Sequence, residues 1–183
     1  MKIASILENQ NIEKRIAVTP DIAKKYISLG FEVLLVNKYA DHLGIKDEEY
    51  SSIGVKFYSD EKEILNNSDI IIQLGLLSDE KSSFLKKGQI LIGSLNSYQN
   101  KEKLNKLKDK EIKVFSLELL PRITRAQSMD ILSSQANLAG YKAVIESFAS
   151  FEKAVPMMMT AAGTVPAAKV LVVGAGVAGL QAV

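Results

Sequence analysis

The stretch from Pro121 to Tyr141 gathers side chains that bind polar and charged ligands: two arginines, two glutamines, an aspartate, an asparagine and four aliphatic hydroxyls. Ser128 is a favourable helix N-cap and Asp130 would suit a first turn, so we expect a helix to begin near Ser128. The side chains in the loop before it, which are free to reach a ligand, are Arg122, Arg125 and Gln127. From composition alone, a capped connecting helix with solvated or paired arginines explains the stretch equally well.

The helix expected after Ser128 carries a strip of small residues at helical spacing. The strip consists of Ser133, Ala136, Ala139 or Gly140, Ala143 and Ser147. Small side chains let another backbone approach closely, so this face is predicted to accept a second segment of chain.

A second candidate motif lies near the end of the chain, where the apolar run KVLVV precedes Gly174, Gly176 and Gly179. In a GxGxxG motif the glycines make a tight turn, let a backbone approach a pyrophosphate and allow close helix packing. We expect a helix opening at Val177, whose N-terminal amides would favour an anion. The alternative is a glycine-rich turn without a ligand, as in any doubly wound domain.

The acidic residue that holds a ribose hydroxyl would follow these glycines by about 20 residues, beyond Val183. The sequence is therefore expected to be a truncated protein with an incomplete dinucleotide-binding domain. We predict that the 183-residue chain binds a dinucleotide poorly or not at all.

Composition excludes several classes of protein. The net charge of +2 comes from lysines scattered among acidic residues, which disfavours nucleic acid as a partner. With no cysteine the chain has neither disulfides nor cysteine metal sites, and we expect no metal and a cytoplasmic location. The apolar region 154–183 is interrupted by Pro156 and Pro166 and is not expected to span a membrane.

Strand and helix patterns alternate along the first part of the chain. The expected strands are 2–7, 31–36, 55–58, 69–74, 89–95 and 112–118. Between them lie capped helices, such as the one that begins with Thr19 and Pro20 and ends at Gly30. Continuous apolar strands of this kind favour an α/β fold, a Rossmann-like open and mostly parallel sheet.

We expect three segments: an N-terminal Rossmann-like α/β domain over 1–127, a linking helix and connector over 128–164, and the first strand and turn of a second Rossmann domain over 165–183. The three methionines at 157–159 are expected to fill gaps at a domain junction. Ligands of open parallel sheets bind beyond the carboxyl ends of strands, and the Pro121 loop follows one such strand.

Three motifs together resemble the alanine dehydrogenase and nicotinamide nucleotide transhydrogenase family: RIAVTP, PRITRAQSMDILSSQANLAGYKAV and TAAGTVPAAKVLVVGAGVAGLQAV. The middle motif looks most like the NAD-binding α subunit of the proton-translocating transhydrogenase. The resemblance implies that Arg122 and Asp130 hold the nicotinamide side of NAD(H) and that Gln127 lies where the partner's NADP(H) arrives. It also implies that Ser128, Ser133 and Tyr141 belong to the same cleft.

The two branches of the family differ in chemistry. The resemblance implies that alanine dehydrogenases use an arginine in the RxAxTP segment, a lysine at the end of the fourth strand and a histidine after the fifth. Here Arg15 is present, Gln73 stands in place of the lysine, and the only histidine, His42, lies elsewhere as an expected surface residue. Hydride transfer between two nicotinamides needs alignment and exclusion of water rather than side-chain proton transfer. The pattern therefore favours the transhydrogenase branch, with Arg15 in an ordinary ion pair.

By this resemblance the chain is expected to be part of an enzyme that transfers hydride between NAD(H) and NADP(H) and is coupled to proton movement. The implied partners are a second copy of the α subunit in a homodimer and an NADP(H)-binding membrane β subunit. The implied location is the cytoplasmic face of the inner membrane, and the fragment alone is expected to be inactive. The alternatives are an alanine dehydrogenase-like amino-acid dehydrogenase and a non-catalytic nucleotide-binding module.

Overall fold

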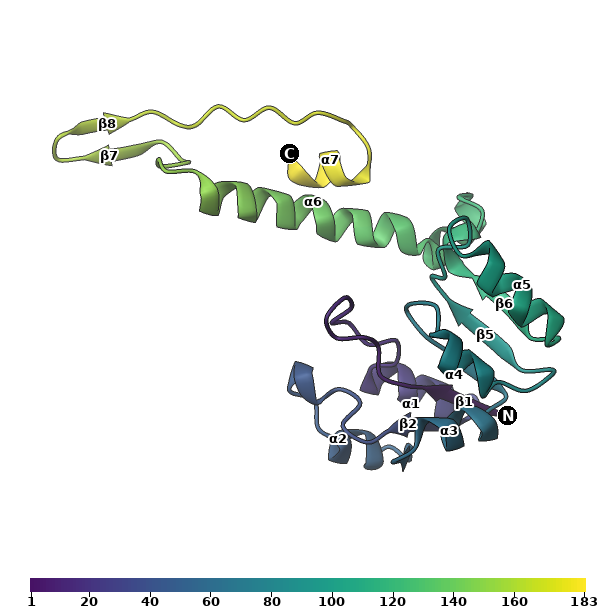
Figure 1. Ribbon diagram of the computed structural model, residues 1–183. Coiled ribbons are helices and arrows are strands. Elements are labelled where there is room, and N and C mark those ends of the chain that lie inside the picture. Colours follow the sequence, from purple (N-terminus) through teal and green to yellow (C-terminus); the bar gives the residue numbers. More distant parts are fainter. The chain divides into compact units, whose positions relative to one another are not determined.

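The computed structural model describes residues 1–183, which form two compact units, Met1–Leu120 and Pro121–Val183. Figure 1 shows the strands and helices of each unit. None of the helices is long and apolar enough to cross a bilayer.

The first unit is a six-stranded sheet in the order β3-β2-β1-β4-β5-β6, in which every neighbouring pair is parallel. The strands are β1 (Lys2–Ser5), β2 (Glu32–Val36), β3 (Lys56–Tyr58), β4 (Ile70–Ile72), β5 (Ile90–Gly93) and β6 (Lys113–Ser116). This order is that of a dinucleotide-binding fold, with the switch of direction between β1 and β4. The structure confirms the predicted α/β class and the open parallel sheet.

Helices connect successive strands of this unit. They are α1 (Pro20–Ser28), the 3₁₀ helix η1 (Asp41–Leu43), α2 (Asp47–Ser51), α3 (Glu61–Asn67), α4 (Asp79–Ser83) and α5 (Lys101–Asp109). The 3₁₀ helix η2 (Leu117–Leu119) follows β6. The predicted cap of α1 is confirmed, because Thr19 Oγ1 accepts the N–H of Ile22 at 3.4 Å and Gly30, with φ +86°, follows its end. Asp60 likewise caps α3.

The central strands form the core of the first unit. Leu34, Leu35 and Ile71 are among its fully buried side chains, and burial of one such side chain contributes roughly 1.5–3 kcal/mol to stability. Helices and loops cover the strands, so their apolar residues are continuous rather than alternating. The loops at the carboxyl edge of the sheet therefore follow strands that are anchored in the core.

The second unit is built on α6 (Ile131–Ser150), which the 3₁₀ helix η3 (Thr124–Met129) precedes. After α6 come the antiparallel hairpin of β7 (Met158–Thr160) and β8 (Gly163–Val165), an extended stretch, and α7 (Val177–Ala182). The extended stretch returns along α6, and α7 packs against the middle of that helix (Figure 1). The predicted end of the long helix near Phe151 and the predicted opening of α7 at Val177 are both confirmed.

Three sequence-based expectations are wrong in this unit. The helix does not begin near Ser128: Ser128 lies within η3, and α6 begins at Ile131 with Asp130 as its N-cap. KVLVV is not a strand, because a strand needs a hydrogen-bonded neighbour and no strand of either sheet pairs with it. The methionines fill no gap, since Met159 in β7 is 85% exposed.

Candidate functional site

The beginning of α6 brings three of the predicted residues together. Arg122 Nε lies 3.6 Å from Asp130 Oδ2, and Arg122 Nη2 donates to Ser133 Oγ at 3.5 Å. Ser133 in turn donates its hydroxyl to Asp130 Oδ2 at 2.7 Å and its backbone N–H to Asp130 Oδ1 at 2.9 Å. A cation, a carboxylate and a hydroxyl, 11 residues apart at most in the chain, thus form one connected cluster.

Asp130 replaces Ser128 as the cap for a physical reason. Its two carboxylate oxygens accept both donors of Ser133, and hydrogen bonds to an ionised acceptor are stronger than those to a hydroxyl. The backbone and side-chain hydrogen bonds from Ser133, followed by the charge of Arg122, lower the pKa of Asp130. The carboxylate is therefore ionised and fixed in direction, while the Arg122 side chain remains 59% exposed.

Gln127 and its neighbours in η3 are positioned by the backbone and not by side-chain contacts. The N–H of Asp130 is bonded to the Gln127 carbonyl at 3.3 Å, and buried Ala126 anchors the turn. The side chains of Arg125, Gln127 and Ser128 are exposed and make no side-chain hydrogen bond in the structure. They are free to reach a ligand, as the loop composition predicts, but they are not part of the Arg122 cluster.

The remaining predicted residue of α6, Tyr141, is 58% exposed. Seven residues make about two helical turns, so Gly140 lies on nearly the same face of α6 as Ser133. The next residue, Tyr141, is rotated by about 100° from that face. The structure places Tyr141 on the same helix as the cluster without bringing it into contact with Asp130 or Ser133.

The predicted small face of α6 is confirmed by α7. Gly140 is the only buried residue of α6, and a Cβ added there would lie 2.1 Å from the carbonyl oxygen of Ala178. Asn137 Nδ2 donates to Gln181 Oε1 at 2.7 Å across the same contact. Asn137 and Gln181 were not predicted from the sequence as contact residues. Asn137 could have been found from its position, because it lies about one helical turn before Gly140.

The glycines of the GxGxxG motif have different surroundings. Gly174 has φ +117°, which favours glycine, and a Cβ at Gly179 would lie 1.9 Å from the Gly174 carbonyl oxygen, so the turn packs closely on α7. A Cβ at Gly176 would meet nothing within 4 Å. Gly176 is the N-cap of α7, and the turn is therefore open to an approaching ligand on the side of the helix N-terminus.

The first unit has its own polar cluster at the carboxyl edge of the sheet. Gln73, only 3% exposed, accepts at Oε1 from the Ser5 hydroxyl and from the Ile6 N–H, both at 2.9 Å. Tyr39 Oη lies 2.8 Å from Ser5 Oγ. Because Gln73 acts here as an acceptor for two donors, a lysine, which only donates, would not replace it.

The other two residues weighed for alanine dehydrogenase chemistry have local partners. Arg15 forms the expected ion pair, with Nη2 at 2.6 Å from Glu13 Oε2. His42 Nε2 donates to the Lys14 carbonyl at 2.8 Å, so His42 ties η1 to the loop after β1, which agrees with the predicted surface position.

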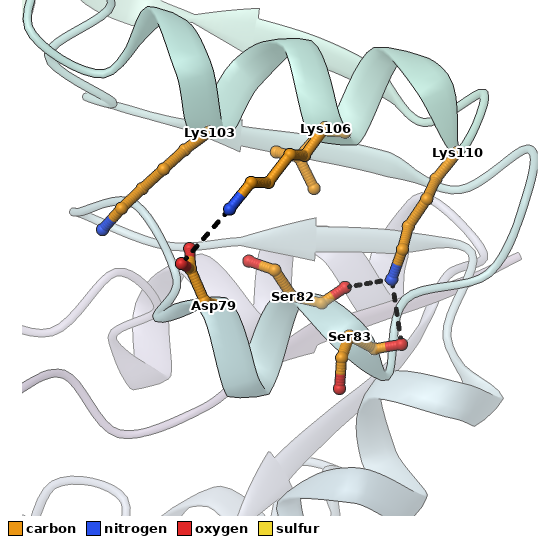
Figure 2. Close-up of a pocket in the computed structure, with 7 residues that line it drawn as sticks. Asp79, Ser82, Ser83, Lys103, Lys106 and Lys110 are labelled. Carbon is orange, nitrogen blue, oxygen red and sulfur yellow. Dashed lines mark hydrogen bonds and ion pairs between the residues drawn. The ribbon is translucent and has the colours of Figure 1, made fainter.

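A groove between α4 and α5 (Figure 2) has a volume of about 150 Å³. Lys110 Nζ donates to the carbonyls of Ser82 and Ser83 at 3.1 Å, and Lys106 pairs with Asp79 at 3.5 Å. The groove is smaller than usual ligand sites of about 300–1,000 Å³, and Lys106, Lys110 and Asp79 are already paired within it. None of the predicted site residues lines it, and we do not assign it as the site.

Comparison with known proteins identifies the family. The chain matches the model of the alanine dehydrogenase/PNT N-terminal domain over residues 6–139 and that of the C-terminal domain over residues 143–183. It is 44% identical to an NAD(P) transhydrogenase subunit alpha protein of Rickettsia prowazekii, across 100% of this chain and 49% of that protein. The chain thus spans about half the length of this relative.

Two solved structures are similar to the chain. The crystal structure of transhydrogenase from Sinorhizobium meliloti gives a TM-score of 0.91 at 43% identity and covers 98% of this chain and 54% of that one. An L-alanine dehydrogenase gives a TM-score of 0.83 at 19% identity, covering 100% and 50%, and this likeness shows the shared fold alone. The resemblance of the three sequence motifs is thereby confirmed along the whole length, and the chain belongs to the alanine dehydrogenase/PNT family.

Proposed function

We propose that the chain is part of the NAD(H)-binding component of a proton-translocating NAD(P) transhydrogenase, which transfers hydride between NAD(H) and NADP(H). The observation that carries the proposal is the 44% identity to a transhydrogenase alpha subunit protein over the entire chain. The proposed partners are a second copy of the subunit and an NADP(H)-binding membrane β subunit, and the proposed location is the cytoplasmic face of the inner membrane.

The residues of the second unit fit an NAD(H) ligand. The turn at Gly174 and Gly176 leaves room for a pyrophosphate near the first amides of α7, beginning at Val177, while Gly179 keeps the helix close to the turn. Exposed Arg122 and fixed Asp130 are the groups proposed to hold the nicotinamide end. When bound, NAD(H) supplies or accepts the hydride.

The protein's own side chains would bind and orient rather than transfer protons. Arg122 can donate hydrogen bonds to a carboxamide oxygen, and Asp130 can accept from a carboxamide N–H, with Ser133 holding Asp130 in place. Exposed Gln127 is proposed to lie where the NADP(H) of the partner arrives, with Ser128 and Tyr141 at the cleft margin. Orientation and exclusion of water are what hydride transfer between nicotinamides requires.

The position of Gln73 argues against the amino-acid dehydrogenase alternative. Glutamine is neutral, so it offers no cation for the carboxylate of a 2-oxo acid, and its amide oxygen already accepts from two buried donors. Hydride transfer between nicotinamides needs no such cation.

The test combines the protein that carries this chain with the NADP(H)-binding component and measures transfer from NADH to an NADP analogue. Gln127→Asn is expected to slow transfer while leaving NADH affinity nearly intact, and Ser134→Ala, an exposed hydroxyl of α6, serves as the matched control. Alanine-dependent reduction of NAD⁺ with no transfer would instead establish the amino-acid dehydrogenase. An unchanged rate for Gln127→Asn would remove Gln127 from its proposed role.

A further inference from the structure

The switch of strand order between β1 and β4 opens the place where folds of this kind bind anionic ligands. β1 pairs with β4 through Ile3 and Ala4, and these two strands end at Ser5 and Ile72. Connections leave these two strands in opposite directions, which creates a crevice beyond their carboxyl ends. Backbone N–H groups at such a crevice are left without strand partners and are available to a ligand.

In the first unit a side chain of the protein already takes up these donors. Glu8 Oε1 accepts the N–H of Leu74 at 2.5 Å and the N–H of Gly75 at 3.4 Å. The two successive amides after β4 converge on one carboxylate oxygen, as amides of a backbone nest converge on a bound anion. A Cβ at Gly75 would lie 3.6 Å from Glu8 Oε2, so the second oxygen also lies against this turn.

A reciprocal contact binds the two segments together. While Glu8 from the β1 segment accepts N–H groups of the β4 segment, Gln73 from the β4 segment accepts the Ile6 N–H of the β1 segment at 2.9 Å. Tyr39 extends this arrangement, because its hydroxyl accepts the N–H groups of Ala17 and Val18 at 3.1 Å. The loop from Glu8 to Val18 is thus fastened at both ends over the carboxyl edge.

The Glu8 side chain is half-buried at this position. Burial raises its pKa, while the hydrogen bonds from Leu74 and Gly75 act in the opposite direction. The two amides therefore replace part of the hydration that a half-buried carboxylate loses. Lys81 adds a weaker favourable charge, and Glu13 an unfavourable one.

We propose that the Leu74–Gly75 turn is a carboxylate-binding site and that Glu8 is its built-in ligand. The site takes small monocarboxylates when Glu8 is removed, and with Glu8 in place the switch point of the first unit is closed to anionic ligands. The proposal does not depend on transhydrogenase activity, because it concerns two amides and one side chain of the first unit.

The test is chemical rescue of Glu8→Ala in the complete 183-residue chain. This substitution removes one methylene and the carboxyl group, which acetate reproduces. Urea unfolding is followed by circular dichroism in sodium acetate and in sodium chloride of equal ionic strength. At an acetate concentration ten times its dissociation constant, the unfolding equilibrium constant of the variant is expected to fall about 11-fold. Chloride should not reproduce this fall.

Wild type and Glu13→Ala are the controls. Wild type has its site filled, and Glu13 is a carboxylate of the same loop that pairs with Arg15 instead of the turn. Neither should respond to acetate beyond chloride. An equal acetate response in all three proteins, or none in a folded Glu8→Ala variant, would overturn the proposal.

Glu8→Gln covers the case in which Glu8→Ala does not fold. Glutamine keeps the size of the side chain and a carbonyl acceptor but loses the charge, so the variant should fold. Its stability should not respond to acetate, and the amide hydrogens of Leu74 and Gly75 should exchange faster than in wild type. Unchanged exchange at those two amides would show that they do not require a carboxylate, and the site would be rejected.

Discussion

Substitution of Gly140 by alanine should release α7 from α6. The added Cβ would lie 2.1 Å from the Ala178 carbonyl oxygen, 2.9 Å from its carbonyl carbon and 3.0 Å from its Cα. Ordinary contacts begin at 3.4 Å, so α7 would have to move by about 1.3 Å, the difference between 3.4 and 2.1 Å. All three obstructing atoms belong to the backbone of Ala178, so no side-chain rotation relieves the clash.

Two energies of opposite sign act at this position. Alanine favours the helical state of α6 by about 1 kcal/mol relative to glycine. Overpacking costs about 1–3 kcal/mol, and this cost falls on the contact with α7. Because α7 has six residues and helices shorter than about 12 residues are marginal in water, α7 cannot keep its hydrogen bonds once it is displaced.

The assay is amide hydrogen exchange at Leu180 and Val183, whose N–H groups are bonded to the carbonyls of Gly176 and Gly179 at 2.9 and 3.2 Å. A loss of 1–3 kcal/mol corresponds to about 5–150-fold faster exchange at these amides. Amides in the middle of α6 should slow or stay unchanged, since the helix itself gains propensity.

Ala139→Gly is the matched control. It is adjacent and exposed, it lowers the helix propensity of α6, and it adds no atom against α7. Exchange at Leu180 and Val183 should remain near the wild-type rate in this variant. The reasoning is refuted if Gly140→Ala leaves both amides within twofold of wild type, or if the control releases α7 equally.

Three further outcomes are expected. Lowering the pH should loosen the start of α6, because the pKa of Asp130 is lower in the folded protein than in the unfolded chain. The stabilisation of the helix by the Asp130 carboxylate is therefore present above the unfolded pKa and is lost as the pH falls through the folded pKa. The amide chemical shift of Ser133 should follow this titration and should stay constant in Asp130→Asn. Tyr39→Phe leaves the N–H groups of Ala17 and Val18, in the loop before α1, without their acceptor and should lower the free energy of unfolding by about 1–3 kcal/mol in urea titrations. An effect below about 0.5 kcal/mol would contradict the role of the hydroxyl. Gly93→Ala puts a Cβ 2.3 Å from the Gln73 carbonyl oxygen and should destabilise the first unit by about 1–3 kcal/mol by overpacking, and a midpoint equal to that of wild type would show that β5 can yield.

Local pattern was sufficient to predict most of the first unit. The apolar runs that became β1, β2 and β4 are short and bounded by caps and glycines, and Thr19, Pro20 and Gly30 mark the limits of α1 by rules that act within a few residues. The polar character of the Arg122 segment and the small face of α6 were also readable, because side-chain type and helical spacing are properties of the sequence alone.

Hydrogen bonds formed in the folded chain decided what the pattern left open. Ser128 and Asp130 are both acceptable N-caps, and the position of Ser133 with its two donors selected Asp130. KVLVV has the composition of a strand, but strand formation requires a neighbouring chain and that condition cannot be read from five residues.

The sequence by itself determined the α/β class, the family and the residue types available for binding a nicotinamide nucleotide. Only the tertiary structure decided which of these residues meet. It joined Arg122, Asp130 and Ser133, left Gln127 and Tyr141 exposed, and brought Glu8 onto amides 66 and 67 residues away. The physical reason is that capping and periodicity act within one or two helical turns, whereas buried donors are satisfied by whichever acceptor the fold brings within reach.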